Sequence, residues 1–170
     1  MKAVALTVVV ALAAGIPLAH AQTEPGHSHA APATTAPVQD VPAEASAAVA
    51  VAERFGAALA AGDLATVESL LAPDVLILET GGAERSREEY LGHHAKSDAQ
   101  FLKGSHSQLT RRRARAEGDL VWIGSESELH ASRDGKPLTL LSTETMLLTN
   151  TPDGWKIVHI HWSSRPKKGA

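Results

Sequence analysis

The sequence predicts an α+β domain in which helices come first and a long antiparallel sheet follows. Apolar residues recur at helical spacing between residues 45 and 103, which predicts amphipathic helices. Long β-prone segments then run from residue 107 to residue 164, joined by short turn sequences. Helices followed by strands in meander order are typical of an α+β plan, with the helices packed on one face of the sheet.

The first 21 residues have the pattern of a secretory signal peptide. Lys2 supplies the positive charge, residues 3–18 form an apolar run, and Ala19-His20-Ala21 is a small-residue cleavage site. The run is short and rich in alanine, so we expect no membrane span after cleavage. The chain contains no cysteine, which fits an exported protein that needs no disulfide. We therefore expect a periplasmic or secreted protein.

Residues 22–45 are rich in alanine, proline, threonine and glutamine without an apolar period, which indicates a flexible linker. Within it, His27 and His29 either take up a divalent ion weakly or are ordinary linker residues. One folded domain over residues 46–165 and a basic tail over 166–170 complete the chain. The formal net charge is -3, so bulk charge predicts no nucleic-acid partner.

The first elements are predicted from apolar spacing and from the residues that end or cap them. Residues 45–61 are alanine-rich with one apolar face, and Gly62 ends this helix. Asp63 caps a second, short helix. Residues 75–79 are β-prone, and the two glycines at 81 and 82 turn the chain.

A third helix is predicted to begin after Ser86 and to run to about Lys103. Ser86 and Glu89 form a capping box, in which the serine accepts from the backbone of Glu89 and the glutamate reaches back. Gly104 ends the helix.

Four strands are predicted over residues 107–116, 119–130, 137–149 and 154–164. Glu117-Gly118 and Asp134-Gly135 are two-residue hairpin signals, and a longer turn joins the last two strands. A sheet with strands this long is expected to curl and to wrap the helices on its concave face.

The closing hairpin is the most specific motif of the chain. It reads Ser142-Thr-Glu-Thr-Met146 and then Asp153-Gly-Trp-Lys-Ile-Val-His-Ile-His-Trp-Ser-Ser164. With the order of elements, this pattern resembles the nuclear transport factor 2-like superfamily in its SnoaL-like and DUF4440-like branch. The hairpin also looks like the end of the calcium/calmodulin-dependent kinase association domain.

The resemblance covers residues 46–165 and implies a cone-shaped α+β barrel with an internal pocket, usually dimeric through the sheet. It implies no single activity, because this fold hosts isomerases, cyclases, dehydratases, binding proteins and assembly modules.

Strand register predicts which side chains line the pocket, because directly opposed residues share a face of the sheet. The first hairpin turn places Arg112 opposite Ile123, and the second places Ser125 opposite Glu144. Centring the last hairpin brings Glu144 opposite His159. The predicted inner face then collects Arg112, Ser125, Ser127, Ser142, Glu144, Met146, Trp155, Ile157, His159, His161 and Ser163. The predicted outer face carries Arg111, Arg113 and Arg115 with Glu126 and Glu128. A slip of one residue would exchange the two faces.

Polar side chains of the third helix are spaced four residues apart, so Tyr90, His94 and Asp98 stack on one face. Phe101 lies on the same face. The family resemblance implies that this helix covers the mouth of the cone, with His94 and Asp98 directed at the inner face of the sheet.

Two interpretations of the Glu144–His159 pair remain open. A carboxylate beside an imidazole orients the ring and raises its basicity, which suits a general base. His159 would then be the catalytic base, Glu144 its orienting partner, and Tyr90, His94 or Asp98 the proton donor. The other interpretation is a polar pair that completes a hydrogen-bond network in the barrel.

Further residues are predicted to contact a ligand. Arg112 is a candidate anchor for a carboxylate group, or a solvated side chain if the register is shifted. The apolar and aromatic residues of the set given below are either ordinary core residues or the wall of a pocket. The predicted ligand-binding set is Tyr90, His94, Asp98, Phe101, Arg112, Met146, Trp155, Ile157, His161 and Ser163.

A metal site is a further hypothesis, because His94, Asp98, Glu144, His159 and His161 are side chains of types that zinc accepts. No compact ligand spacing supports it, so the sequence predicts neither a metal-ligand set nor a cofactor. The sequence also lacks a nucleophile elbow, a P-loop and a dinucleotide-binding fingerprint.

The residues and the resemblance together predict an exported homodimer that holds a small organic molecule. They do not decide whether the protein is an enzyme. Acid–base chemistry of the isomerase or dehydratase kind is the first hypothesis. A non-catalytic ligand-binding or assembly module is the second, and a metal-binding protein that uses the pocket histidines is the third. The sequence names no substrate.

Overall fold

The computed structural model describes residues 36–133 and 135–168, which belong to the unit that spans residues 34–170. The predicted signal peptide and the linker histidines His27 and His29 lie outside the described residues, as do Asp134 and the last two residues. Among the described residues, no helix is long and apolar enough to cross a membrane.

The helical segments are a 3-10 helix (Ala43–Ala45), α1 (Ser46–Ala61), α2 (Leu64–Leu70), α3 (Arg87–Gly92) and α4 (Ala95–Lys103). The boundary between α1 and α2 follows the predicted caps. Gly62 ends α1 with a φ of 75°, a left-handed conformation that glycine adopts without steric cost. Asp63 begins α2, because its side chain accepts a hydrogen bond from Thr66 N at 3.0 Å.

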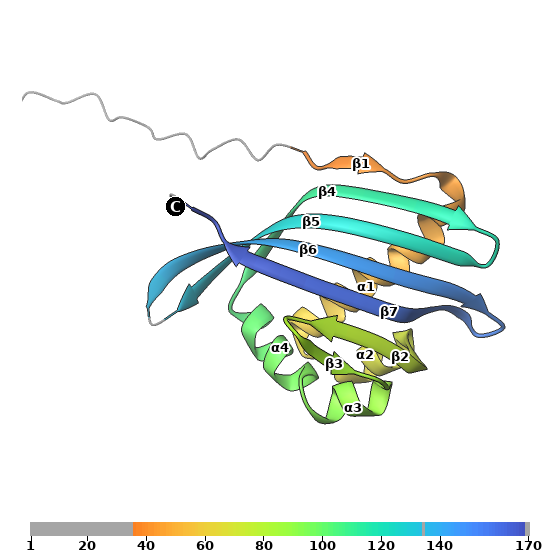
Figure 1. Ribbon diagram of the computed structural model, residues 1–170, viewed down its shortest axis with the longest axis horizontal. Helices are drawn as coiled ribbons and strands as arrows, with labels where there is room; N and C mark the ends of the chain where they lie inside the picture. The colour runs from red at the N-terminus through yellow and green to blue at the C-terminus, as the bar shows by residue number, and fades with distance from the viewer. Residues whose placement is uncertain (1–35, 134, 169–170) are drawn as a thin grey trace, which may run out of the picture. The chain divides into compact units, whose positions relative to one another are not determined.

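In the described part of the chain, the strands form one seven-stranded sheet in the order β1-β4-β5-β6-β7-β2-β3. Their bounds are β1 (Val38–Asp40), β2 (Leu71–Glu79), β3 (Gly82–Glu84), β4 (His106–Glu117), β5 (Leu120–Arg133), β6 (Lys136–Thr151) and β7 (Gly154–Pro166). β4 to β7 form the predicted antiparallel meander, and β2 pairs parallel to β7. Figure 1 shows an open, curved sheet with α1 across one face. The α+β prediction is therefore confirmed.

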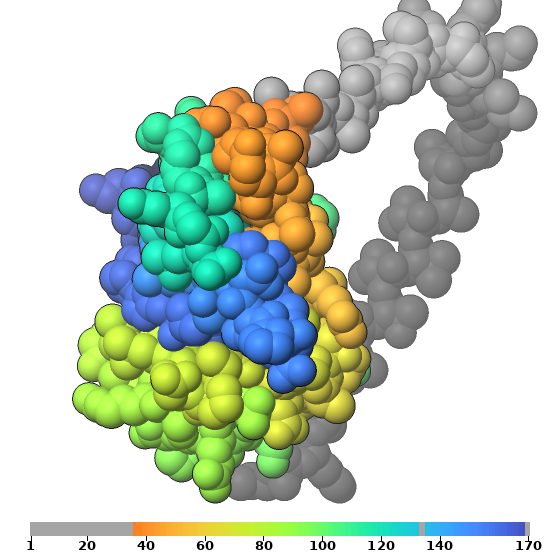
Figure 2. All heavy atoms as spheres, turned by 90° about the vertical axis from the view of Figure 1, so that its right-hand side faces the viewer, coloured from red at the N-terminus to blue at the C-terminus, as the bar shows by residue number. Residues whose placement is uncertain are grey.

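The core lies between α1 and the concave face of the sheet. Figure 2 shows the helical layer, coloured orange to yellow, along one side of the teal and blue strands. Phe55 and Leu59 of α1 are buried in one cluster with Ile123, Met146 and Ile160 of the sheet. Burial of an apolar side chain of this size stabilises a fold by about 1.5–3 kcal/mol, so this layer contact holds the domain together.

β1 lies within the segment whose composition indicated a linker, and that interpretation is wrong for residues 38–40. β1 pairs parallel with β4, with Asp40 opposite Arg113. Asp40 Oδ2 lies 2.6 Å from Arg115 Nη2 and 3.4 Å from Arg113 Nε. These ion pairs hold the strand to partners more than seventy residues away, a contact that local composition cannot reveal.

The predicted third helix is two helices, and its predicted continuity is wrong. The helical path breaks at His93, whose φ of -117° and ψ of -86° are not helical. Gly92 precedes the break, and glycine weakens a helix by about 1 kcal/mol relative to alanine. Tyr90 and His94 therefore do not share a continuous helical face.

In the first two hairpins, the observed registers leave the predicted inner-face residues on the same face of the sheet. Ser125 lies opposite Glu144, as predicted. Glu117 pairs with Leu120, so the first turn lies one residue later than predicted, and Arg112 is opposite Ser125. This differs by two residues from the predicted pairing, and a shift of two preserves the face.

The predicted pairing of Glu144 with His159 is wrong. Glu144 lies opposite Trp162, and His159 lies opposite Leu147 on the other face of the sheet. β7 contains a register shift at Val158. One extra residue in a strand reverses the alternation of faces beyond it, so the second half of β7 presents the opposite set of side chains.

Candidate functional site

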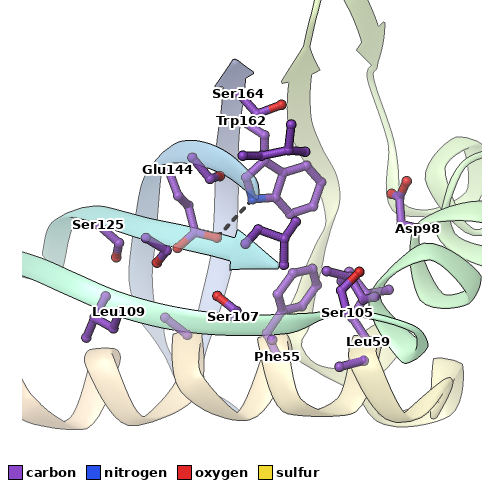
Figure 3. A pocket seen from close by; sticks show the side chains of 18 of the residues that line it. Phe55, Leu59, Asp98, Ser105, Ser107, Leu109, Ser125, Glu144, Trp162 and Ser164 are labelled. Carbon is purple, nitrogen blue, oxygen red and sulfur yellow. Dashed lines mark hydrogen bonds between the residues drawn. The ribbon is translucent and has the colours of Figure 1, made fainter. Parts of the chain in front are cut away.

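A pocket of about 430 Å³ is lined by α1, α4 and the concave face of β4 to β7 (Figure 3). Phe55 and Leu59 give the α1 wall its apolar character, and Phe101 of α4 also lines the pocket. The sheet wall carries polar groups, including Arg112 and Glu144. Pockets that bind drug-sized molecules have volumes of about 300–1,000 Å³ and a similar mixture of apolar walls and a few polar groups.

One cross-strand row supplies the charged part of the pocket. It consists of Arg112 of β4, Ser125 of β5, Glu144 of β6 and Trp162 of β7. Directly opposed residues on neighbouring strands have Cβ atoms about 4.5–5.5 Å apart, so these side chains contact one another. The adjacent row is apolar and buried: Ala114, Ile123, Met146 and Ile160. The charged row therefore marks the boundary between the closed core and the pocket.

Glu144 is the acid of this row. Its Oε2 accepts a hydrogen bond from Trp162 Nε1 at 2.9 Å, the dashed line in Figure 3. Burial raises the pKa of the Glu144 carboxyl above its ordinary value. Hydrogen bonds from Trp162 and Ser125 and the charge of Arg112 oppose this shift without cancelling it. The carboxyl therefore holds a proton to higher pH than an exposed glutamate does.

Arg112 has its charge compensated within the protein. Its Nη1 pairs with Glu53 Oε1 of α1, and its Nε donates to Ser125 Oγ at 3.3 Å. The Arg112 side chain is only 11% exposed, whereas that of Glu53 is 56% exposed. A poorly solvated guanidinium needs such a partner, because an unpaired charge away from water costs several kcal/mol.

A row of hydroxyl groups lies beside the charged row, on the side away from the apolar row. Ser127 of β5, Ser142 of β6 and Ser164 of β7 lie in register and line the pocket. A serine hydroxyl both donates and accepts hydrogen bonds. The row can therefore contact oxygen or nitrogen atoms of a molecule that lies against the sheet.

Asp98 of α4 lies on the opposite side of the pocket from Glu144 (Figure 3). Its Oδ2 accepts a hydrogen bond at 3.0 Å from the hydroxyl of Tyr90, a residue only 1% exposed. Burial raises the pKa of Asp98. The hydrogen bond from Tyr90 and the charge of His94 lower it by less, so the pKa remains above its ordinary value. Partial burial and the charge of Asp98 also raise the pKa of Glu79, at the end of β2. This end of the pocket thus carries two carboxyl groups that retain protons more readily than usual.

His94 is not among the lining residues of this pocket. Its Nδ1 pairs with Oε1 of the buried Glu84 of β3. Both residues, with Glu79, border a second hollow of about 330 Å³. The break between α3 and α4 thus directs this histidine to β3.

Apart from the three histidines, the sequence-predicted site residues fall into two groups. Those that line the pocket are Glu144, Asp98, Phe101, Arg112 and Ser163. Those that pack in or against the core are Tyr90, Met146, Trp155 and Ile157. Tyr90 reaches the pocket only through its hydrogen bond to Asp98.

The two strand histidines lie away from the pocket. His159 Nδ1 donates to the carbonyl oxygen of Leu76 at 2.9 Å, and His161 is exposed opposite Thr145. The observed register therefore separates the predicted base, His159, from Glu144. Within residues 36–133 and 135–168, no group of three or more histidine, aspartate or glutamate side chains is arranged to hold a metal ion.

Glu53, Glu79 and Trp162 are among the polar lining residues that were not predicted. Glu53 follows Ala52 on α1, at the edge of the apolar stripe, so its position on the helix could have suggested it. Strict alternation along β7 places Trp162 on the face opposite His161, because the extra residue in this strand has no local signal. Glu79 is the last residue of β2. The tertiary fold brings it to the pocket, and no local sequence pattern indicates this.

Comparison with known proteins gives the family. A family model described as a SnoaL-like domain matches residues 48–166. A solved structure of a proposed ketosteroid isomerase from Shewanella frigidimarina NCIMB 400 is 38% identical, covers 69% of this chain and 94% of its own, and has a TM-score of 0.66. No curated protein matches the chain.

Two further solved structures share the fold. A proposed dehydratase of the NTF2-like family from Streptomyces avermitilis is 20% identical and covers 74% of this chain and 97% of its own, with a TM-score of 0.59. The CaMKII hub of S. rosetta is 22% identical and covers 74% of this chain and 100% of its own, with a TM-score of 0.60. The match over residues 48–166 shows that the chain belongs to the SnoaL-like domain family, and the solved structures show that it shares the NTF2-like fold.

Proposed function

We propose that the protein binds a small, partly apolar organic molecule in the pocket and transfers a proton on it through Glu144. One observation carries this proposal: a carboxyl group with a raised pKa lines a pocket whose α1 wall is largely apolar. General acid–base catalysis is most effective when the pKa of the catalytic group lies near the working pH. Burial moves the pKa of Glu144 in that direction.

Proton abstraction next to a carbonyl group suits this arrangement. Ionised Glu144 removes a proton from the carbon beside the ligand carbonyl, and the electrons of the broken C–H bond form an enolate. Asp98, held by Tyr90 on the opposite side of the pocket, donates a hydrogen bond to the enolate oxygen when it is protonated. Glu144 then returns the proton to a different carbon, which completes an isomerisation.

Two solved structures support this class of reaction. One is named a proposed ketosteroid isomerase and the other a proposed dehydratase. Isomerisation of an unsaturated ketone and loss of water beside a carbonyl group both begin by removing a proton from carbon. We take from them the reaction class and leave the substrate open.

A β,γ-unsaturated 3-ketosteroid tests the proposal, because its conversion to the conjugated enone is followed by ultraviolet absorbance. Glu144→Gln preserves the size of the side chain and an acceptor for Trp162. We expect this variant to bind the probe but to lower kcat by about 10²- to 10⁴-fold, the usual contribution of a general base. Glu128→Gln, which changes an acid of β5 outside the pocket, should leave kcat unchanged. Equal kcat values for the wild type and Glu144→Gln would contradict the proposal.

A non-catalytic binding module is the second candidate, and one observation favours it. No buried side-chain nitrogen or oxygen atom in the described residues lacks a hydrogen-bond partner, so groups of the protein itself satisfy the buried polar atoms of this region. A binding module would retain the probe without forming product, and Glu144→Gln would change only affinity or stability.

We also propose that the protein is exported and forms a homodimer. The pattern of residues 1–21 supports export to the periplasm or the medium. The face of the sheet opposite α1 supports the dimer, because Leu120 and Trp122 remain 42% and 38% exposed there. Exposed apolar side chains on a sheet face are typical of a protein–protein contact.

A further inference from the structure

We infer that Glu53 sets the charge selectivity of the pocket, so that uncharged ligands are accepted and carboxylates are rejected. The inference rests on the proposed function, because it concerns which molecules enter the same pocket. It follows from the charges on the pocket wall, from the bonding of Arg112 and from the unequal exposure of the ion pair.

Acidic side chains outnumber basic ones among the charged groups of the described pocket wall. Glu53, Glu79, Asp98 and Glu144 line it, and Arg112 is the one basic residue among the lining residues described. Charges of one sign act strongly on a ligand inside a cavity with low-dielectric walls. An anionic ligand would therefore need Arg112 as its partner.

Arg112 is already engaged by other groups of the protein. Its Nη1 pairs with Glu53, and its Nε donates to Ser125 Oγ at 3.3 Å. A guanidinium binds a carboxylate best through two parallel N–H···O bonds. A ligand carboxylate would have to compete with Glu53 for the same group, and it would bring another negative charge beside Glu144.

The two members of the ion pair differ in exposure. The Glu53 side chain is 56% exposed and that of Arg112 is 11% exposed. Loss of the Glu53 charge would therefore leave a poorly solvated guanidinium at the pocket wall, with Ser125 as its hydrogen-bond partner and Glu144, whose pKa is raised, as the acid that remains near it. Because an unpaired charge away from water is costly, an incoming carboxylate would then become its counter-ion. Glu53 thus acts as a built-in competitor for anions.

A matched pair of probes tests this inference. 1-Naphthylacetamide and 1-naphthylacetate share a flat apolar ring system and differ in charge. Binding to the full chain is measured by isothermal titration calorimetry at pH 8, where the acetate is ionised. We expect the wild type to bind the amide at least about tenfold more tightly than the acetate, because of the charge repulsion.

Glu53→Gln removes the competing charge and preserves the size of the side chain. This variant should reduce the preference for the amide by at least about tenfold, through tighter binding of the acetate with little change for the amide. Glu53→Asp keeps the charge and should keep the preference. Glu44→Gln removes an exposed carboxylate outside the pocket and should behave like the wild type.

Each outcome of the titrations is decisive. Equal affinity of the wild type for the two probes would overturn the inference, and so would a preference that survives Glu53→Gln. A Glu53→Asp variant that binds the acetate as Glu53→Gln does would show that charge is not the cause. Binding without selectivity counts against this inference alone. Failure of both probes to bind any variant counts against the proposed pocket as well.

Discussion

Glu144 shows how desolvation and hydrogen bonding compete at a single carboxyl group. Trp162 and Ser125 donate hydrogen bonds to it and Arg112 lies near, and each of these favours the ionised form. Removal from water favours the neutral form and is the larger effect. Asp98 shows the same balance on the other side of the pocket, where burial outweighs the hydrogen bond from Tyr90. Both carboxyl groups are therefore suited to exchange protons rather than to act as fixed charges.

The raised pKa of Glu144 makes stability depend on pH in a definite direction. A carboxyl whose pKa is higher in the folded than in the unfolded protein stabilises the fold at low pH, and this contribution is lost as the pH rises through the folded-state pKa. Glu144→Gln cannot ionise and so avoids the loss. We expect the free energy of unfolding of Glu144→Gln, relative to wild type, to increase between about pH 4 and pH 8.

Urea denaturation at a series of pH values measures this difference. Glu128→Gln is the matched control, because its carboxyl lies outside the pocket, 2.7 Å from Lys167 Nζ. It should not show the increase. A difference for Glu144→Gln that stays constant or falls with rising pH would contradict the assigned direction of the pKa shift.

Sequence patterns predict the β-strands and their inner faces as far as the first half of β7. There one extra residue enters the strand, and no local sequence feature indicates it. The Asp134-Gly135 turn gave the correct register between β5 and β6, and with it the inner-face positions of Ser125 and Glu144. The register shift at Val158 reverses the faces of the rest of β7. Valine, isoleucine and histidine alternate there without glycine or proline, so nothing local marks an irregularity. Sequence reasoning thus identified Glu144 and Arg112 as pocket residues. It placed His159 opposite Glu144, where the structure has Trp162.

The proposed dimer is tested at the outer face of the sheet. Trp122 lies in one row with Arg115 of β4 and Leu147 of β6. We expect the wild type to be a dimer by light scattering after size-exclusion chromatography, and Trp122→Glu to be a monomer, because a charge would be buried in the interface. Phe101→Glu, which changes an exposed apolar residue of α4, should remain a dimer. A monomeric wild type, or a dimer that survives Trp122→Glu, would argue against this interface.

The whole domain makes the pocket by packing helices over only part of a long curved sheet. The apolar row from Ala114 to Ile160 is sealed beneath α1, and the next rows carry the charged groups and the serines that line the pocket. Helix and strand order, predictable from apolar periodicity, determine this plan. Contacts such as the ion pair of Glu53 with Arg112 join residues that are distant in sequence. They could not be predicted from local patterns.

The most direct test of proton transfer by Glu144 is hydrogen exchange on a ketone probe. The full chain is incubated in D₂O with the β,γ-unsaturated 3-ketosteroid, and the deuterium content of the recovered ketone and of its conjugated product is measured by mass spectrometry. We predict deuterium incorporation with the wild type that falls to the uncatalysed level with Glu144→Gln and persists with Glu128→Gln. Incorporation that is equal in the wild type and Glu144→Gln would contradict the account.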